Sequence, residues 1–334
     1  MTDIASGPAV RRLYGRSALS RVISVQTLPY LMVPVMFLLM VLTLSGFLSK
    51  SSVVSLLILA SLLGLASLGQ TLTIITGGVD LSIPSVIGLA EILITQKYAD
   101  GWSLATIFLV LIGLSVVIGV INAMAPILLR VPALITTLGT GFVIQGIALA
   151  GSHGFTQGKV PAWLKTTVSP IGHTWFIPLP GIIVAWVILA ALAISFLRFT
   201  RIGREGFANG ANPLAAKLAG VRSTWVLIVV FTISALCASL VGVFFAGYSG
   251  LPDANVGQPY FFETITAVVI GGTSLLGGGG SYTRTVIGAL IVAELTTLLV
   301  GVNFGVSAQE MFLGIAIVLL ATIYGRQSDI STRI

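Results

Sequence analysis

Residues 53–75 read VVSLLILASLLGLASLGQTLTII, and this stretch contains no charged side chain. About 20 consecutive apolar residues are enough for a helix to cross the hydrocarbon core of a bilayer. The stretch therefore has the length and the polarity of a transmembrane helix.

The composition of the whole chain extends this interpretation. Of its 334 residues, 56% are hydrophobic and only 8% are charged, and the mean hydropathy is +1.07. A soluble domain is roughly 25% charged, so a soluble enzyme is excluded. Glycine contributes 38 residues, which is typical of closely packed membrane helices. The single cysteine, Cys237, excludes a disulfide framework and a cysteine-built metal site.

Ten segments of this kind predict an all-α, polytopic membrane protein with about ten transmembrane helices. The membrane domain covers residues 28–325, between an N-terminal segment (1–27) and a C-terminal tail (326–334). The predicted spans are 28–48, 53–75, 81–96, 103–128, 133–150, 178–198, 223–247, 263–276, 285–302 and 309–325.

The basic residues predict the orientation of these helices. With the N-terminus inside, 13 of the 17 Lys and Arg residues lie in cytoplasmic segments, and the four outside are Lys50, Lys97, Lys159 and Lys165. An excess of Lys and Arg marks cytoplasmic loops. We therefore expect both termini and the loop 199–222 in the cytoplasm and the loop 151–177 outside. Because the basic residues are scattered over several loops, they do not form a nucleic-acid footprint.

An internal similarity suggests two weakly related halves. Residues 75–95 and residues 269–295 each contain Gly-Gly after an apolar run, then a polar patch, then Val-Ile-Gly and a glutamate, Glu91 or Glu294. Both segments adjoin short or proline-interrupted spans. Paired broken spans are a sequence indication of a transporter site near the bilayer midplane.

Three motifs carry a resemblance to a known family. They are TGGVDLS at 76–82, GREGFANGANPLAAKLAGV at 203–221, and VIGGTSL at 269–275 with its continuation to Gly280 and Ser281. Together they resemble the permease subunits of ribose/xylose/galactose-type bacterial ABC importers, in the ribose/branched-chain amino acid permease superfamily. The sequence departs from the family pattern at several positions, including Asn209, where a small or apolar residue is usual.

The resemblance implies a permease that imports a monosaccharide or similar small polyol across the bacterial inner membrane. Its implied partners are a cytoplasmic ABC ATPase, a periplasmic or lipid-anchored sugar-binding protein, and a second permease copy or a homologous permease. ATP and Mg would bind to the ATPase, and this chain would hold no cofactor. The glycine-rich run 277–281 is not followed by the Gly-Lys-Ser/Thr of a phosphate-binding loop, so we expect no enzymatic activity from this chain alone.

The loop 199–222 is the expected coupling segment to the ATPase. Gly203 and Gly210 permit turns, and Asn212 followed by Pro213 predicts the start of a short helix that ends at Gly220. A purely topogenic basic loop is the alternative interpretation. The candidate coupling residues are Gly203, Arg204, Gly210, Asn212, Ala215, Ala216 and Gly220.

Polar residues inside the predicted spans are the candidates for a translocation path or gate. An ionisable group at mid-membrane costs on the order of 2.5–3.5 kcal/mol, so such groups should face protein or water. Helix capping by Asp80 and hydrogen bonding between helices by the others are the structural alternatives. The candidates are Gly77, Gly78, Asp80, Glu91, Asn122, Gln145, Gly271, Gly272 and Glu294. No catalytic or metal-binding residue is predicted.

Two other transport functions are compatible with the sequence. A branched-chain amino-acid ABC permease is the near alternative within the superfamily. An ion-coupled secondary transporter would use Glu91 and Glu294 as proton carriers and would not need ATP.

Overall fold

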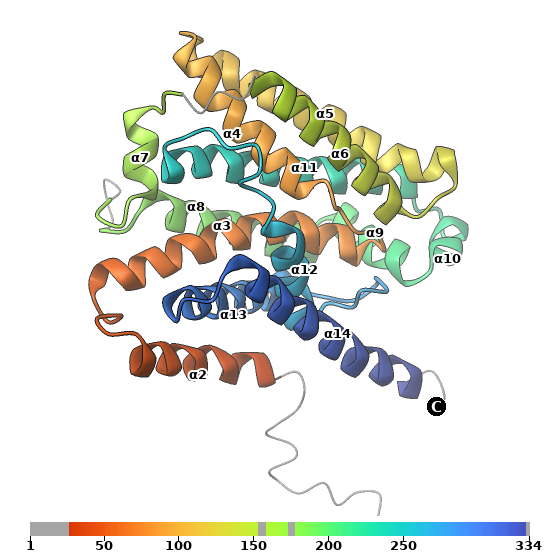
Figure 1. Ribbon diagram of the computed structural model, residues 1–334. Coiled ribbons are helices and arrows are strands. Elements are labelled where there is room, and N and C mark those ends of the chain that lie inside the picture. The colour runs from red at the N-terminus through yellow and green to blue at the C-terminus, as the bar shows by residue number, and fades with distance from the viewer. Residues whose placement is uncertain (1–26, 153–157, 173–177, 332–334) are drawn as a thin grey trace, which may run out of the picture.

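The computed structural model describes residues 27–152, 158–172 and 178–331, and the regular secondary structure in these ranges is entirely helical (Figure 1). Of the predicted N-terminal segment 1–27, all but Thr27 lies outside the described residues, as do the last three residues of the chain. The helices are α2 (Leu28–Thr43), α3 (Lys50–Ile75), α4 (Ile83–Ala99), α5 (Leu104–Leu129), α6 (Ala133–Ser152), α7 (Ala162–Val168), α8 (Gly181–Phe199), α9 (Arg201–Ala211), α10 (Pro213–Leu218), α11 (Ser223–Ser249), α12 (Tyr260–Ile270), α13 (Tyr282–Gly301) and α14 (Val306–Ser331).

The predicted all-α, polytopic membrane fold is confirmed. Six helices of the described ranges are long and apolar enough to cross a membrane, namely α3, α5, α6, α8, α11 and α13. Helices α2 and α12 and the apolar part of α14 are shorter, and α4 has 17 residues. Each of the ten predicted spans overlaps one of these helices. The predicted span 263–276 was wrong at its end, because the helix stops at Ile270 and a glycine-rich turn follows.

Helix α3, which contains the apolar stretch 53–75, lies at the centre of the bundle. It packs against α8, α11, α12 and α13. Its glycines permit close approach: a Cβ on Gly64 would meet the Trp186 ring of α8, and one on Gly69 would lie 2.7 Å from the Ser234 Cα of α11. Small residues drive helix association in membranes by this kind of close contact.

The two ends of the bundle carry different short helices. In Figure 1, α9, α10 and the end of α14 lie at the right-hand end, and α7 lies at the left-hand end. The predicted topology requires this separation of α9 and α10, in the loop 199–222, from α7 in the described part of the loop 151–177. The assignment of the α9–α10 end to the cytoplasm stays a prediction.

Candidate functional site

The three sequence motifs meet at one end of the bundle. The backbone nitrogen of Gly278 donates a hydrogen bond to the carbonyl oxygen of Ile75, at 2.9 Å. The Asn209 side chain of α9 donates to the carbonyl oxygen of Thr76, at 3.1 Å. Segments separated by more than 130 residues in sequence are thus joined by one bond between main-chain atoms and one from a side chain to the main chain. We call this contact region the glycine junction.

Glycine is required at the glycine junction because the backbones touch. A Cβ on Gly210 would meet the carbonyl oxygen of Ile75, and it would lie 2.5 Å from the nitrogen of Gly278. Gly277 faces the Gly77 Cα in the same way, at 2.9 Å from the position of its missing Cβ. Gly77 and Gly277 also adopt positive φ angles, +88° and +85°, which favour glycine. The small residues therefore serve contacts within this chain.

The ends of α3 and α12 have the same hydrogen-bond pattern. Gly77 and Gly78 donate to the carbonyl oxygens of Ile74 and Thr73, and Gly272 and Thr273 donate in the same way to Val269 and Val268. This pair of bonds, with a left-handed glycine between them, is a Schellman cap. The internal similarity of the two segments thus corresponds to one local structure. Gly271 packs against the Arg284 backbone of α13, so Gly271 and Gly272 shape a turn, and neither lines any of the cavities below.

The first half of the expected coupling loop is a helix and not a series of turns. Residues 201–211 form helix α9, so the prediction that Gly203 and Gly210 make turns was wrong. Thr200 caps α9 by accepting a hydrogen bond from the Gly203 nitrogen, at 3.0 Å. Arg204 donates to the Phe199 carbonyl oxygen at the end of α8. These bonds let α9 continue directly from α8, and the chain needs no glycine turn there.

The short helix predicted after Asn212 is present as α10. The Asn212 side chain accepts a hydrogen bond from the Ala215 nitrogen, at 3.0 Å, and Pro213 occupies the first helical position. Gly220 follows the helix with φ +82°. Ala216 is buried against the protein, whereas Ala215 is exposed and its neighbours Leu214 and Leu218 are 69% and 82% exposed. The exposed leucines give α10 an outward apolar face that the sequence analysis missed.

Asp80 organises a buried polar cluster beside the glycine junction. Its carboxylate accepts hydrogen bonds from the Ser82 nitrogen and hydroxyl, from the Ser234 hydroxyl of α11 at 2.7 Å, and from the Asn122 amide of α5 at 3.4 Å. Thr137 of α6 bonds the neighbouring backbone of residues 79 and 81. The Asp80 carboxylate thus joins the segment before α4 to α5 and α11, and Thr137 adds α6. The participation of Ser234 gave no signal in the sequence.

Glu91 and Gln145 form hydrogen bonds toward the other end of the bundle, away from the glycine junction. The Ser249 hydroxyl donates to Glu91 Oε1 at 2.7 Å. Gln145 Nε2 donates to the Ala254 carbonyl oxygen and to Asn255 Oδ1, at 3.1 and 2.9 Å. Both residues therefore fix the segment between α11 and α12. The other intramembrane carboxylate, Glu294, is buried in α13, and no described residue hydrogen-bonds its Oε2.

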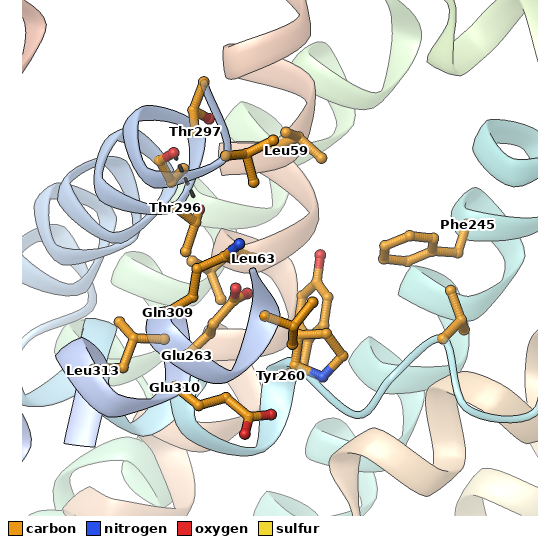
Figure 2. Close-up of a pocket in the computed structure, with 15 residues that line it drawn as sticks. Leu59, Leu63, Phe245, Tyr260, Glu263, Thr296, Thr297, Gln309, Glu310 and Leu313 are labelled. Atoms are coloured by element: carbon orange, nitrogen blue, oxygen red, sulfur yellow. Dashed lines mark hydrogen bonds between the residues drawn. The ribbon is translucent and has the colours of Figure 1, made fainter. Parts of the chain in front are cut away.

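Three of the cavities that described residues line lie among these elements. The first, of about 260 Å³, lies between α4, α6, α12 and α14 and is lined by Ser85, Gln145, Gln258 and aromatic rings, with Glu310 at its edge. The second is a groove of about 1100 Å³ bounded by the end of α5, by α10 and by the start of α11; we call it the α10 groove. Figure 2 shows the third, of about 360 Å³, where Glu263 of α12 and Gln309 and Glu310 of α14 line the wall.

The predicted path residues therefore do not form one site. Gly77 and Gly78 line the α10 groove, and Gln145 lines the 260 Å³ cavity. None of the predicted residues lines the 360 Å³ cavity in Figure 2. Gln258 and Glu310, which lie outside the motifs, were missed because they contribute to a cavity only through the packing of α12 and α14.

Comparisons with known proteins agree with the motif assignment. The chain is 29% identical over 282 residues to the autoinducer 2 import system permease protein LsrC of Salmonella paratyphi B, covering 84% of this chain and 80% of the relative. It is 30% identical over 270 residues to LsrC of Escherichia coli (strain K12 / DH10B), covering 80% and 77%. No solved structure matches the chain significantly.

A family match extends over most of the sequence. Residues 52–322 match the family described as "Branched-chain amino acid transport system / permease component". The matched range contains all three motifs and the helices α4 to α13. The chain therefore belongs to this family of permease components, within the ribose/branched-chain permease superfamily.

Proposed function

We propose that this chain is the membrane-spanning subunit of an ATP-driven importer for a monosaccharide or similar small polyol. Family membership and the similarity to import-system permeases support this function. In the proposed assembly a cytoplasmic ATPase binds ATP and Mg, a binding protein delivers the substrate, and a second permease completes the path. The observation that carries the mechanism is the glycine junction, which ties α9 to both broken segments of the membrane domain.

Energy would enter through α10. Leu214 and Leu218 lie on its exposed face, and an amphipathic helix of this size gains stability by docking in a partner's groove. A displacement of α10 moves α9, since only Asn212 separates the two helices. Helix α9 contacts the end of α3 at Thr76 and the turn after α12 at Gly278. A displacement of α10 would therefore move the end of α3 and the turn after α12 together.

The 260 Å³ cavity is the best candidate for a substrate-facing surface. Ser85, Gln145 and Gln258 offer neutral hydrogen-bonding groups, and Phe142 and Phe261 offer apolar faces. Neutral polar groups with aromatic walls suit a polyol, which has hydroxyl groups and C–H surfaces but no charge. The exposed Phe142 side chain places this cavity at the edge of the chain, where a second permease copy would close it.

A branched-chain amino acid is the second candidate substrate, and the description of the matched family favours it. An amino acid carries two charges, so its path needs charged or strongly polar partners; Glu310 at the edge of the cavity is such a group. Against this candidate, the described residues that line the cavity include no basic side chain for the carboxylate.

Reconstitution distinguishes these functions. The permease is co-expressed with its proposed ATPase and binding protein, purified, and placed in proteoliposomes. Uptake of radiolabelled pentoses, hexoses and branched-chain amino acids is measured with and without internal ATP. We expect ATP-dependent uptake of a sugar or polyol. Uptake that follows a proton gradient without ATP would contradict the proposal, and ATP-dependent uptake of leucine or valine would replace the substrate class.

A further inference from the structure

The α10 groove lies at the end of the bundle that carries α9 and α10, and its walls are apolar. Pro126 and Ile127 of α5 form one wall, and Leu227 and Ile228 of α11 form the other. Its volume is about 1100 Å³, and no described part of the chain fills it. In water such a surface would favour association, and in a bilayer it is available to acyl chains.

The surroundings of the α10 groove are apolar and exposed. Leu128 and Leu129 at the end of α5 are 71% and 67% exposed, and Trp225 at the start of α11 is 57% exposed. Helix α5 exposes apolar side chains along its length, as expected of a helix that faces lipid. The α10 groove therefore continues the exposed apolar surface of α5. A tryptophan at such a position is typical of the membrane–water interface.

The rim of the α10 groove is basic. Lys217 of α10 and Arg222, just before α11, line it and are exposed, and none of the described residues that line it is acidic. An anionic headgroup is attracted to a juxtamembrane Lys or Arg by about 1 kcal/mol per residue. Leu214 and Leu218, the exposed apolar face of α10, do not line the α10 groove. The surface suited to the ATPase and the α10 groove are thus different faces of this region.

We propose that the α10 groove binds one anionic phospholipid, with its headgroup at Lys217 and Arg222 and an acyl chain between Ile127 and Ile228. Thr76, Gly77 and Gly210 also line the α10 groove. The bound lipid would therefore lie against the glycine junction and limit how α9 and α10 move. This inference does not depend on which substrate the permease imports.

Lipid binding to the purified full-length chain tests the proposal. The dissociation constants of phosphatidylglycerol and phosphatidylcholine are measured by native mass spectrometry in detergent. We expect phosphatidylglycerol to bind about 25-fold more tightly, because two basic residues attract its anionic headgroup. The double variant Lys217→Gln/Arg222→Gln should weaken phosphatidylglycerol binding about 25-fold, roughly fivefold for each positive charge, and leave phosphatidylcholine binding unchanged.

The matched control is Arg198→Gln/Arg201→Gln, which removes the same charge at the same end of the bundle without touching the α10 groove. It should keep the wild-type affinity for phosphatidylglycerol. Ile228→Trp fills the groove and should weaken binding of both lipids. Equal affinities for the two lipids, or an equal loss in both double variants, would overturn the proposal. Displacement of phosphatidylglycerol by the ATPase would assign the groove to that protein and overturn it as well.

Discussion

Asn209 Nδ2 lies 3.1 Å from the carbonyl oxygen of Thr76, in a position where the Asn209 side chain is only 5% exposed. The bond joins α9 to the residue that caps α3, so a departure from the family's usual small or apolar residue has a structural use here. Little of the side chain is therefore open to water that could replace the bond. The two elements should consequently move as one unit.

Removing this bond is expected to uncouple ATP hydrolysis from transport. Asn209→Ala leaves the Thr76 carbonyl oxygen without its side-chain donor, which costs about 1–3 kcal/mol. We expect a small fall in the thermal midpoint of the purified protein and at least a tenfold loss of stimulation of ATP hydrolysis by the binding protein. The control is Ser115→Ala, which removes the buried hydrogen bond to Ser239, between α5 and α11. A similar loss of coupling in both variants would refute a specific role for Asn209.

A methyl group at Gly210 should be poorly tolerated. In Gly210→Ala the new Cβ collides with the main chain at Ile75 and Gly278, and forced overpacking costs about 1–3 kcal/mol. The contact is with backbone atoms, which cannot move aside as a flexible side chain does. We expect a lower membrane level and no transport. Gly279→Ala is the control, because its Cβ would meet nothing within 4 Å, and it should retain normal level and uptake.

The carboxylate of Asp80 is expected to be needed for stability. Asp80→Leu removes the acceptor of the Ser82 and Ser234 hydroxyl groups and leaves these donors buried, at about 1–3 kcal/mol for each unsatisfied group. The thermal midpoint and uptake should both fall. Asp80→Asn keeps one acceptor oxygen and should have a smaller effect. The control is Asp100→Asn, which changes an exposed ion pair with Lys97 and should leave the thermal midpoint and uptake unchanged. An equal fall in this variant would contradict the importance of burial at Asp80.

The sequence predicted the bundle better than the site, for a physical reason. Membrane spans depend on a local property, the run of apolar residues near 53–75 and its counterparts, so they can be read without knowing the packing. The α10 cap could also be predicted, because Asn212 and Pro213 act on their own helix. The Gly-Gly segments could be recognised, but their contact partners could not.

Long-range packing decided what the sequence left open. Nothing in the neighbourhood of Gly210 indicates that Ile75 and Gly278 lie against it, so its small size was explained as a turn. Ser234 resembles any other serine in an apolar helix until α11 brings it to Asp80. Glu91 and Glu294 share a sequence context yet have different surroundings. Among the described residues, a hydroxyl group, that of Ser249, donates to Glu91 and none donates to Glu294.

The orientation of the bundle can be tested by cysteine labelling in intact cells. Cys237 is free and buried, so Cys237→Ser supplies a silent background. Lys165→Cys on α7 and Lys217→Cys on α10 place exposed thiols at opposite ends of the bundle. A membrane-impermeant maleimide should label position 165 in intact cells and position 217 only after permeabilisation. The reverse pattern would invert the predicted topology.

The outward face of α10 is expected to dock against the ATPase. Leu214 and Leu218 are one helical turn apart and strongly exposed, and six residues are too few for a helix to be stable in water unaided. If the ATPase covers this face, Leu218→Glu places a charge in an apolar contact, and an unpaired buried charge costs several kcal/mol. We expect the variant to insert normally, to lose the ATPase during co-purification, and to abolish uptake.

Two further variants separate docking from folding at α10. Leu218→Met keeps an apolar side chain of similar volume and should keep both the ATPase and uptake. Ala216→Trp overpacks the inward face, where Ala216 is 4% exposed, and should lower the membrane level of the permease itself. Helix α10 is then held to the protein through Ala216 and to the ATPase through Leu218. If Leu218→Glu co-purifies with the ATPase in wild-type amount and still supports uptake, the energy input lies elsewhere on this end of the bundle.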